Sequence, residues 1–312
     1  MEETRPTALH QSGISDLRFC PMRYYASQVL RIEPRVVSDA LKDGKLFHRA
    51  LETAARETDR ERQRFAAFGQ VRADLEAGRC QPINAARVRA MLTGYFRKWG
   101  GMTWQTWARE YPVSGPIPGI EGLTYEGTID RVIEVQGGFA VVDYKTASRV
   151  DDSYLEALAR RLQGPLYAWY LEQDQGIEVV EIIYDLVVKP SGNYRPSKIK
   201  SGPRKGEQEN MAEFENRLQA VYQERLDKML FRPALDLTRE HREEALRILA
   251  DTAREVLWRL DTGNWCENRD ACEGGVKSYP CPYRQACYSR FNPVIVEQNY
   301  RVKSLDNGDA EV

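Results

Sequence analysis

The stretch GTIDRVIEVQGGFAVVDYKTA, residues 127–147, decides the fold of this chain. It holds two segments rich in β-branched residues, Gly127 to Val135 and Phe139 to Lys145, which are joined across a glycine-rich turn at residues 136–138. Two such segments separated by so short a turn predict an antiparallel β-hairpin. The hairpin is therefore the reference for the elements on either side of it.

Three charged side chains of this hairpin are expected to form one site. Asp143 and Lys145 are two positions apart, so they leave the same face of their strand, and Asp130 on the partner strand can join them. A carboxylate pair beside an ammonium is typical of sites that bind a divalent cation and a phosphate. In such a site Lys145 would orient or deprotonate the attacking water. The hairpin therefore predicts metal-assisted phosphodiester hydrolysis.

The segments after the hairpin predict a β-β-α-β order. Residues 151–173 have helical spacing and are expected to form one long helix over the sheet, with Gln163 and Tyr167 on a shared face. Residues 178–188, EVVEIIYDLVV, are strongly β-branched, as expected of a central strand. A helix that connects two strands of one sheet predicts an α/β fold with a mixed central sheet.

Two segments before the hairpin can add to the site. Residues 39–57 predict an amphipathic helix that carries His48, one of three histidines. An imidazole beside carboxylates suits Mn²⁺, whereas Mg²⁺ prefers oxygen ligands. Residues 102–113 predict a strand that carries Glu110. Glu110 is either an exposed strand residue or a third carboxylate near the site.

The composition predicts an ordinary globular protein. Apolar residues make up 42% and charged residues 29% of the 312 residues, and the net charge is −1. Any nucleic-acid binding must therefore come from a local basic patch. Residues 189–206 contain six Lys and Arg and no acidic residue, so they are either solvated surface or a loop that grips phosphates. Because we find neither a leader peptide nor an apolar window of membrane-spanning length, we expect a cytoplasmic protein that contacts no membrane.

The motifs resemble those of a nuclease family. GTIDR, VVDYKTA and QGPLY (residues 163–167) are similar to the core motifs of the RecB-like branch of the PD-(D/E)XK nuclease superfamily, and LFHRAL (residues 46–51) resembles the upstream histidine motif of that branch. The resemblance implies a restriction-endonuclease-like core, which is a mixed central sheet flanked by helices. It also implies site roles: Asp130, Asp143 and Lys145 as the catalytic metal-binding acids and lysine, His48 as a further metal ligand, and Gln163 and Tyr167 as a pair that contacts DNA or supports the site.

The cysteines form a second group of candidate metal ligands. Four of the six lie between Cys266 and Cys287, and Cys20 lies within residues 13–29, a predicted helix with Ser15 as its N-cap. Pro21 means that the helix either starts there or kinks at Cys20, and both arrangements leave the thiol at a helix end. Four thiolates at one site suggest tetrahedral zinc or an iron–sulfur cluster. The chain has no C-x2-C pair of the kind that zinc sites usually present.

One cysteine before the hairpin and three after it resemble the iron–sulfur site of the AddB nuclease subunit and of the Cas-four group of CRISPR adaptation nucleases. The resemblance implies a 4Fe-4S cluster that is held by Cys20, Cys272, Cys281 and Cys287 and fastens the two ends of the chain. Those relatives carry C-x2-C-x5-C, whereas eight residues separate Cys272 from Cys281 here. Cys266 is therefore the alternative ligand, and zinc is the alternative metal.

Together these motifs imply a metal-dependent DNA nuclease that uses Mg²⁺ or Mn²⁺. We expect an exonuclease that acts on single-stranded DNA or duplex ends in recombination, repair or CRISPR adaptation, with a helicase or an integrase as protein partner. The alternative is a DNA-end-binding or complex-forming module with the nuclease fold. The feature against this alternative is the full set of His48, Asp130, Asp143 and Lys145.

The expected organisation has four parts. Residues 1–100 form an N-terminal helical region that carries Cys20 and His48, and residues 101–206 form the nuclease core. Residues 207–294 hold two long helices and the cysteine segment. Residues 295–312 are expected to be a loosely ordered polar tail.

Overall fold

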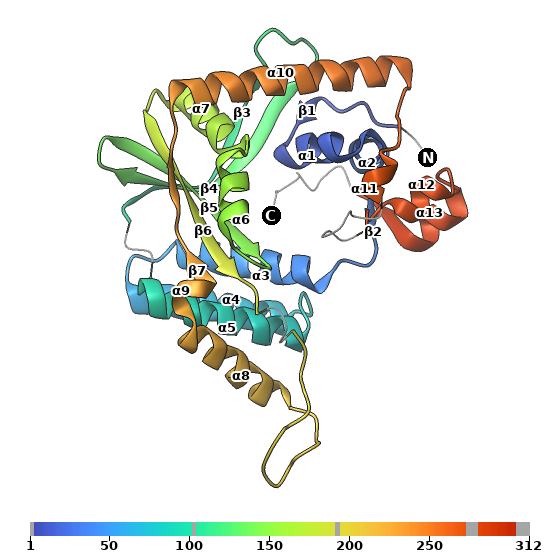
Figure 1. Ribbon diagram of the computed structural model, residues 1–312. Helices are drawn as coiled ribbons and strands as arrows, with labels where there is room; N and C mark the ends of the chain where they lie inside the picture. Colours follow the sequence, from blue (N-terminus) through green and yellow to red (C-terminus); the bar gives the residue numbers. More distant parts are fainter. Residues whose placement is uncertain (1–2, 102–103, 191–193, 273–279, 304–312) are drawn as a thin grey trace.

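A seven-stranded mixed sheet forms the centre of the protein in the computed structural model, which describes residues 3–101, 104–190, 194–272 and 280–303 (Figure 1). Its strands are β1 (Ala8–Leu9), β3 (Thr106–Pro116), β4 (Thr124–Val135), β5 (Gly138–Ala147), β6 (Val179–Val188), β7 (Leu230–Phe231) and β8 (Ala234–Asp236). The sheet and the helices on its two faces confirm the restriction-endonuclease-like architecture that the motifs imply.

The predicted hairpin is present as β4 and β5, which pair antiparallel from Val135 with Gly138 to Arg131 with Val142. Gly138 is required at this turn, because a Cβ there would lie 2.6 Å from the backbone oxygen of Glu178. Strand β3 pairs antiparallel with β4, and β6 runs parallel to β5. The β-β-α-β order is therefore confirmed.

The connection between β5 and β6 differs from the single helix expected over residues 151–173. It consists of α6 (Asp152–Ala159) and α7 (Gln163–Gln175). The reason is Pro165, whose ring would clash with the carbonyl of Arg161 in a continuous helix. A new helix that begins at Gln163 places Pro165 in its first turn, where no intrahelical N–H bond is needed. The break also fixes Gln163 at a helix start.

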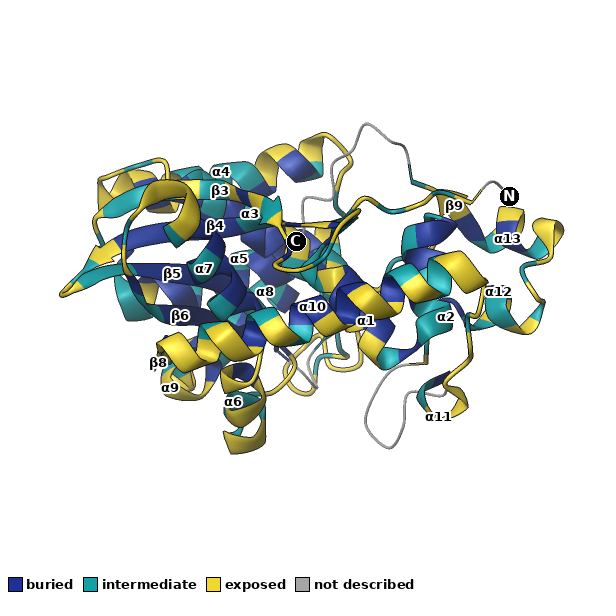
Figure 2. Ribbon diagram, turned by 90° about the horizontal axis from the view of Figure 1, so that it is seen from above, coloured by how far each residue is buried: buried dark blue, intermediate teal, exposed yellow. Residues whose placement is uncertain are grey.

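Two apolar cores lie on the two faces of the sheet (Figure 2). One is built with α1 (Gln11–Phe19), α7 and the long α10 (Arg239–Thr262), whose C-cap is Gly263. The other is built with α3 (Asp39–Ala54), α4 (Arg60–Glu76), α5 (Pro82–Trp99) and α8 (Met211–Glu224). The short α9 (Leu226–Met229) follows α8, which ends at Glu224.

The two ends of the chain meet in a separate small lobe, which we call the terminal lobe. Strand β2 (Ile32–Pro34) pairs antiparallel with β9 (Tyr300–Val302), and α13 (Pro293–Asn299) packs beside them. The lobe also contains α11 (Arg269–Cys272) and α12 (Arg284–Tyr288). Its own apolar core consists of Ala26, Leu30, Ile32, Tyr283, Ala286, Val296 and Tyr300. The expectation of a loose tail is therefore wrong for residues 295–303, and residues 304–312 lie outside the described part.

The N-terminal helix also differs from its prediction. It starts at Gln11, and Ser15 is not its N-cap but donates its hydroxyl to the carbonyl of Gln11 at 2.9 Å. Cys20 is an extended residue between α1 and α2 (Pro21–Tyr24), which is followed by a π-helical turn at Tyr25–Val29. The thiol therefore lies at a helix end, as both alternatives required.

Strand β3 begins and ends later than the sequence predicts. The strand expected over residues 102–113 is β3 at Thr106–Pro116, and residues 102–103 lie outside the described part. In the portions of the chain that the structure covers, no helix combines the length and the apolar character needed to cross a bilayer.

Packing of α5 against α8 makes a prediction about stability. A Cβ on Gly94 would lie 2.8 Å from the ring of Tyr222, which is buried and donates its hydroxyl to the carbonyl of Val188 at 2.7 Å. We expect Gly94→Ala to lower the free energy of unfolding by about 1–3 kcal/mol, because the ring cannot move away.

The matched control is Gly69→Ala in α4, where no atom lies within 4 Å of the added Cβ. A glycine in a helix interior costs about 0.5–1 kcal/mol relative to alanine, so this variant should be more stable than the parent. Urea unfolding of both variants tests the packing. A gain in stability for both would contradict it.

Candidate active site

Three acidic residues on neighbouring strands come together at the end of the hairpin pairing. The register of β3 with β4 places Glu110 opposite Asp130. The β4–β5 pairing ends at Arg131 and Val142, and Asp130 and Asp143 are the next residues on the two strands. The carboxylates therefore gather where the two strands stop bonding to each other.

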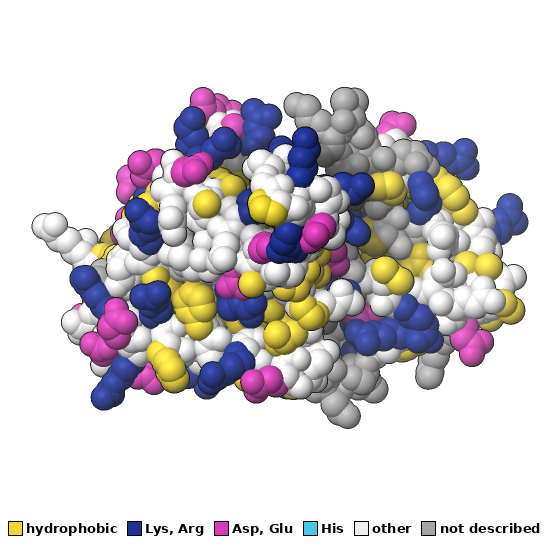
Figure 3. Space-filling view, turned by 90° about the horizontal axis from the view of Figure 1, so that it is seen from below, with side chains coloured by type: hydrophobic (Ala, Val, Ile, Leu, Met, Phe, Trp, Pro, Cys, Tyr) yellow, Lys and Arg dark blue, Asp and Glu magenta, His cyan; other side chains and the backbone are white. Residues whose placement is uncertain are grey.

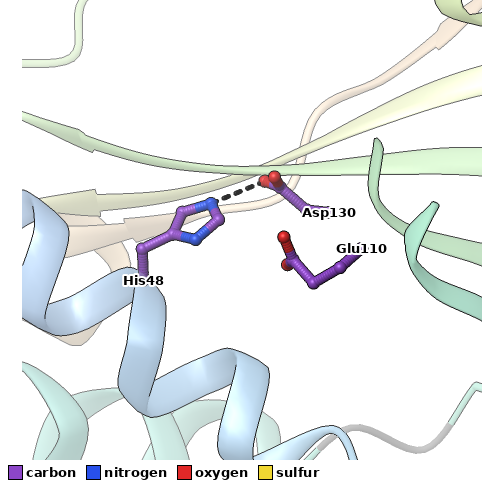
Figure 4. A group of neighbouring side chains, drawn as sticks. All are labelled: His48, Glu110 and Asp130. Atoms are coloured by element: carbon purple, nitrogen blue, oxygen red, sulfur yellow. Dashed lines mark hydrogen bonds and ion pairs between the residues drawn. The ribbon is translucent and has the colours of Figure 1, made fainter. Parts of the chain in front are cut away.

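His48 reaches Asp130 from helix α3 (Figure 4). Its Nε2 lies 2.8 Å from Asp130 Oδ2, and the same oxygen accepts the backbone N–H of Tyr144 at 2.7 Å. Burial opposes protonation of His48, but the Asp130 carboxylate outweighs it and raises the pKa of His48 to about 9. In the metal-free protein His48 and Asp130 therefore form a buried ion pair.

Glu110, whose role the sequence left undecided, lies beside His48 and Asp130. Its ligand atom and those of His48 and Asp130 all lie within 4.8 Å of one another, and Figure 4 shows its carboxylate directed toward the pair. Burial, followed by repulsion from Asp130, raises the pKa of Glu110 to about 7. Its backbone has a φ of +43°, a conformation uncommon for residues other than glycine. Such strain is typical of functional sites.

A chain of hydrogen bonds links the other predicted residues. Lys145 Nζ lies 2.7 Å from Asp143 Oδ2 and donates to Gln163 Oε1 at 3.1 Å, and Gln163 Nε2 donates to the hydroxyl of Tyr167 at 3.1 Å. Burial raises the pKa of Asp143; the Lys145 ammonium opposes this shift, and the charge of Asp130 adds to it. The structure thus brings together all six residues that the motifs singled out.

The donor set fits a hard divalent cation. Glu110 Oε1 is buried and accepts no hydrogen bond from any described residue. Such an oxygen is costly to bury unless a partner satisfies it. Two carboxylates with one imidazole are a ligand set that Mn²⁺ accepts, and the oxygens alone suit Mg²⁺. A cation here would satisfy Glu110 and offset the repulsion between Glu110 and Asp130.

Glu110 had only a weak sequence signal. It follows the alternation of a strand that is rich in aromatic residues, and this pattern places many exposed acids as well. Its role depends on the register of β3 with β4, which pairs it with Asp130.

The cysteines lie apart from this site, in the terminal lobe. Cys20 is buried and its sulfur accepts the backbone N–H of Asn268 at 3.3 Å, and the backbone N–H of Cys281 donates to the carbonyl of Cys272 at 2.9 Å. Burial, a hydrogen bond to Glu267, and the charges of Cys272 and Cys20 raise the pKa of Cys287 to about 12. Cys20 and Cys272 thus lie near enough to Cys281 and Cys287 for their charges to disfavour ionisation of these two thiols.

Cys266 differs from these four. It is exposed, and its sulfur accepts a weak hydrogen bond from Arg259 at 3.7 Å. Cys80 lies elsewhere, between α4 and α5. Cys272 lies near enough to Cys281 and Cys287 to raise their pKa values, whereas Cys266 is exposed. We therefore group Cys272, and not Cys266, with Cys281 and Cys287.

The basic segment 189–206 is partly engaged within the protein. The hydroxyl of Tyr194 donates to Asp43 at 2.6 Å, and its ring lies under the guanidinium of Arg87 at 3.9 Å. Arg204 forms an ion pair with Glu207 at 2.6 Å. Residues 191–193 lie outside the described part. The start of this segment therefore contacts α3 and α5, and at least one of its cations, Arg204, is paired with an acidic residue.

Comparison with known proteins identifies the fold. Residues 8–288 match the family model described as the PD-(D/E)XK nuclease superfamily. The crystal structure of a candidate exonuclease from Eubacterium rectale aligns over 88% of this chain and 90% of its own, with 13% identity and a TM-score of 0.50. At that identity the likeness shows the fold alone. The structure of SSO0001 aligns over 81% of this chain and 78% of its own, with 10% identity and a TM-score of 0.34. No curated protein matches the chain.

The His48–Asp130 ion pair predicts how stability depends on pH. The pKa of His48 is raised from 6.5 to about 9, so its stabilising contribution is complete below pH 6.5 and is lost as the pH rises through 9. We expect the metal-free protein to lose at most about 3 kcal/mol over this range. Urea unfolding in a chelator at several pH values measures the loss.

The variant His48→Gln should flatten that dependence, because it removes the titrating group. The matched control is His241→Gln on α10, which leaves the buried pair intact and should keep the dependence of the parent. An unchanged pH profile in His48→Gln would contradict the assignment.

Proposed function

The chain belongs to the PD-(D/E)XK nuclease superfamily, and we propose that it is a metal-dependent deoxyribonuclease of the RecB-like branch. The observation that carries the proposal is the meeting of His48, Glu110 and Asp130 within 4.8 Å, beside the Asp143–Lys145 ion pair. His48 and the Gln163–Tyr167 pair, which set this branch apart in the sequence motifs, lie at the same site.

His48 and Asp130, which the motifs imply as ligands, would hold Mg²⁺ or Mn²⁺ together with Glu110. Asp143, the third ligand that the motifs imply, forms an ion pair with Lys145 in the metal-free protein and would complete the set from there. A bound divalent cation offsets negative charge on a phosphodiester and makes a water molecule nucleophilic near neutral pH. Asp130 is fixed for this role from two sides, since its Oδ2 contacts both His48 and the backbone N–H of Tyr144. A cation would take the place of the proton that links His48 Nε2 to Asp130 in the metal-free protein, and the three ligand atoms already lie within 4.8 Å of one another.

Lys145 is the residue that we expect to act on the reacting phosphate. Asp143 and Gln163 hold its ammonium from two directions, and Tyr167 fixes the amide of Gln163 so that its oxygen faces Lys145. A held ammonium can orient the attacking water and offset charge that develops on the phosphate oxygens. Gln163 and Tyr167 are thus positioning residues, which act through Lys145.

We propose an exonuclease that acts on single-stranded DNA or on duplex ends. The relative from Eubacterium rectale is named as a candidate exonuclease, which favours this activity. The net charge of −1 argues against tight sequence-independent binding along a duplex, because such binding needs many phosphate contacts. A local site near Lys145 suits one strand better.

The variant Lys145→Ala tests the nuclease proposal. We expect cleavage of labelled linear single-stranded DNA, with Mg²⁺ or Mn²⁺, to fall by about 10²-fold or more, because the phosphate loses its held ammonium. The control Lys228→Ala changes an exposed lysine of α9 and should cleave as the parent does. Comparison of linear with circular DNA separates exonuclease from endonuclease. Undiminished cleavage by Lys145→Ala would refute the assignment.

We also propose that Cys20, Cys272, Cys281 and Cys287 hold a 4Fe-4S cluster. Burial, with smaller contributions from Cys20 and Cys272, raises the pKa values of Cys281 and Cys287, so these two thiolates are unfavourable without a metal. Thiolates are the usual ligands of such clusters. The cluster would join the segment after α1 to the C-terminal segment and so brace the terminal lobe.

The described cysteine sulfurs do not form the compact group that a tetrahedral zinc ion needs. Tetrahedral zinc, with Zn–S bonds near 2.3 Å, requires its sulfurs to lie roughly 3.8 Å apart. Within the described part of the chain, cysteine sulfurs form no group of three within 4.8 Å. We therefore base the choice of a 4Fe-4S cluster on the resemblance of the cysteine pattern, and metal analysis decides between the cluster and zinc.

Metal analysis of protein purified without oxygen tests the cluster. We expect a brown protein with about 4 iron atoms per chain, and loss of iron in Cys287→Ala. The control Cys80→Ala should keep its iron, since that thiol lies between α4 and α5. Iron retained in Cys266→Ala and lost in Cys272→Ala would support our choice of ligand. A colourless protein with one zinc would refute the cluster.

A further inference from the structure

A cavity of about 390 Å³ has Lys145 in its lining, and Asp143 does not belong to that lining. Helix α3 forms one wall with Gly44, Lys45 and His48, and strand β5 forms the floor with residues 144–146. The rest of the lining comes from Tyr154 of α6, from Arg161 between α6 and α7, and from Lys189, which directly follows β6. The cavity thus begins at the catalytic group and leads away from it.

The charged side chains that line this cavity are all of one sign. Elsewhere, as on the face in Figure 3, Lys and Arg side chains stand next to Asp and Glu. The cavity lining includes Lys45, Lys145, Arg161 and Lys189 but no acidic residue. Such a lining is suited to an anion.

Lys189 gives independent evidence for an anionic ligand. It is 9% exposed, and no described residue forms a hydrogen bond or an ion pair with its ammonium. The nearest acid with an influence on it is Asp43, but that carboxylate already accepts hydrogen bonds from Asn84 and Tyr194, both at 2.6 Å. A buried cation without a close partner is costly. An anion in the cavity would remove that cost.

Lys45 and Arg161 are two further cations of the cavity lining that have no ion-pair partner among the described residues, and both are exposed. They come from different elements, α3 and the segment between α6 and α7, so they lie on separate walls. An anion that enters from solvent therefore meets these two cations first and Lys189 deeper in the cavity.

We propose that this cavity is a phosphate-binding subsite for the substrate strand, next to the phosphate that is cleaved. The proposal rests on the proposed nuclease function, since it takes Lys145 as the reaction centre. Lys45, Arg161 and Lys189 bind the oxygens of a neighbouring phosphate, and the exposed side of the Tyr154 ring offers a surface for a base. The subsite holds the strand so that the next phosphate lies at Lys145.

DNA binding measured at equilibrium without a divalent cation tests the subsite separately from cleavage, because cleavage requires the cation. Fluorescence anisotropy of a labelled oligothymidylate in EDTA, over a series of salt concentrations, gives the affinity and its salt dependence. Each phosphate contact on a single strand contributes about 0.7 to the slope of log K against log salt. We expect Lys189→Met and Lys45→Met each to lower the slope by about 0.7, which is about fivefold in affinity at 0.1 M salt.

The matched control is Lys228→Met, which removes the same charge from an exposed lysine of α9 outside the cavity. Lys189→Met keeps the apolar stem of the side chain, and Lys45 is exposed, so loss of folding in one variant leaves the other as a test. If both cavity variants bind as Lys228→Met does, the subsite is refuted.

Oligonucleotides that end in a phosphate or in a hydroxyl distinguish the source of the bound phosphate. If the subsite takes a terminal phosphate, the parent binds the phosphorylated end more tightly and Lys189→Met removes the difference. If it takes an internal phosphate, the two ends bind alike and Lys189→Met weakens both. Either result supports the subsite.

Cleavage by the parent separates this proposal from the nuclease proposal. If the parent cleaves DNA but the cavity variants bind DNA as the control does, the subsite alone is wrong. If the parent binds DNA through the cavity but cleaves none under any metal, the nuclease proposal is wrong and the phosphate subsite stands.

Discussion

The site depends on where the β4–β5 pairing ends. Beyond Arg131 and Val142 the two strands stop bonding to each other, and this leaves room for the side chains of Asp130 and Asp143. The opening also lets both helical layers contribute: α3 brings His48 from one face, and α7 brings Gln163 from the other. A hairpin paired to its ends would exclude one of the two.

Two buried groups of opposite charge are left without a close partner, and together they describe a ligand. Glu110 has a carboxylate oxygen that nothing described satisfies, and Lys189 has an ammonium without an ion pair. The first favours a cation and the second favours an anion. Glu110 lies near His48, and Lys189 lines the same cavity as His48 and Lys145. A cation together with a nucleic-acid phosphate satisfies both, which is the chemistry of a metal-dependent nuclease.

The terminal lobe is built differently from the sheet domain. Its apolar core is small, and its two strands come from opposite ends of the chain, so closing it costs much conformational entropy. A small core rarely supplies enough stability by itself. The four cysteines beside this core give a physical reason for a cluster there, since metal ligation adds stability where apolar burial is limited. The long α10 connects this lobe with the nuclease core (Figure 2).

The sequence by itself determined the hairpin, the β-β-α-β order and the six residues His48, Asp130, Asp143, Lys145, Gln163 and Tyr167, because strand alternation, helical spacing and short motifs are local properties. The break at Pro165 is also local, and its omission was an error of interpretation. Only the tertiary structure decided the role of Glu110, which depends on strand register, the pairing of β2 with β9, and the exposure of Lys189 to a cavity. Each of these joins residues far apart in the chain, and no local pattern records which distant segments will pack together.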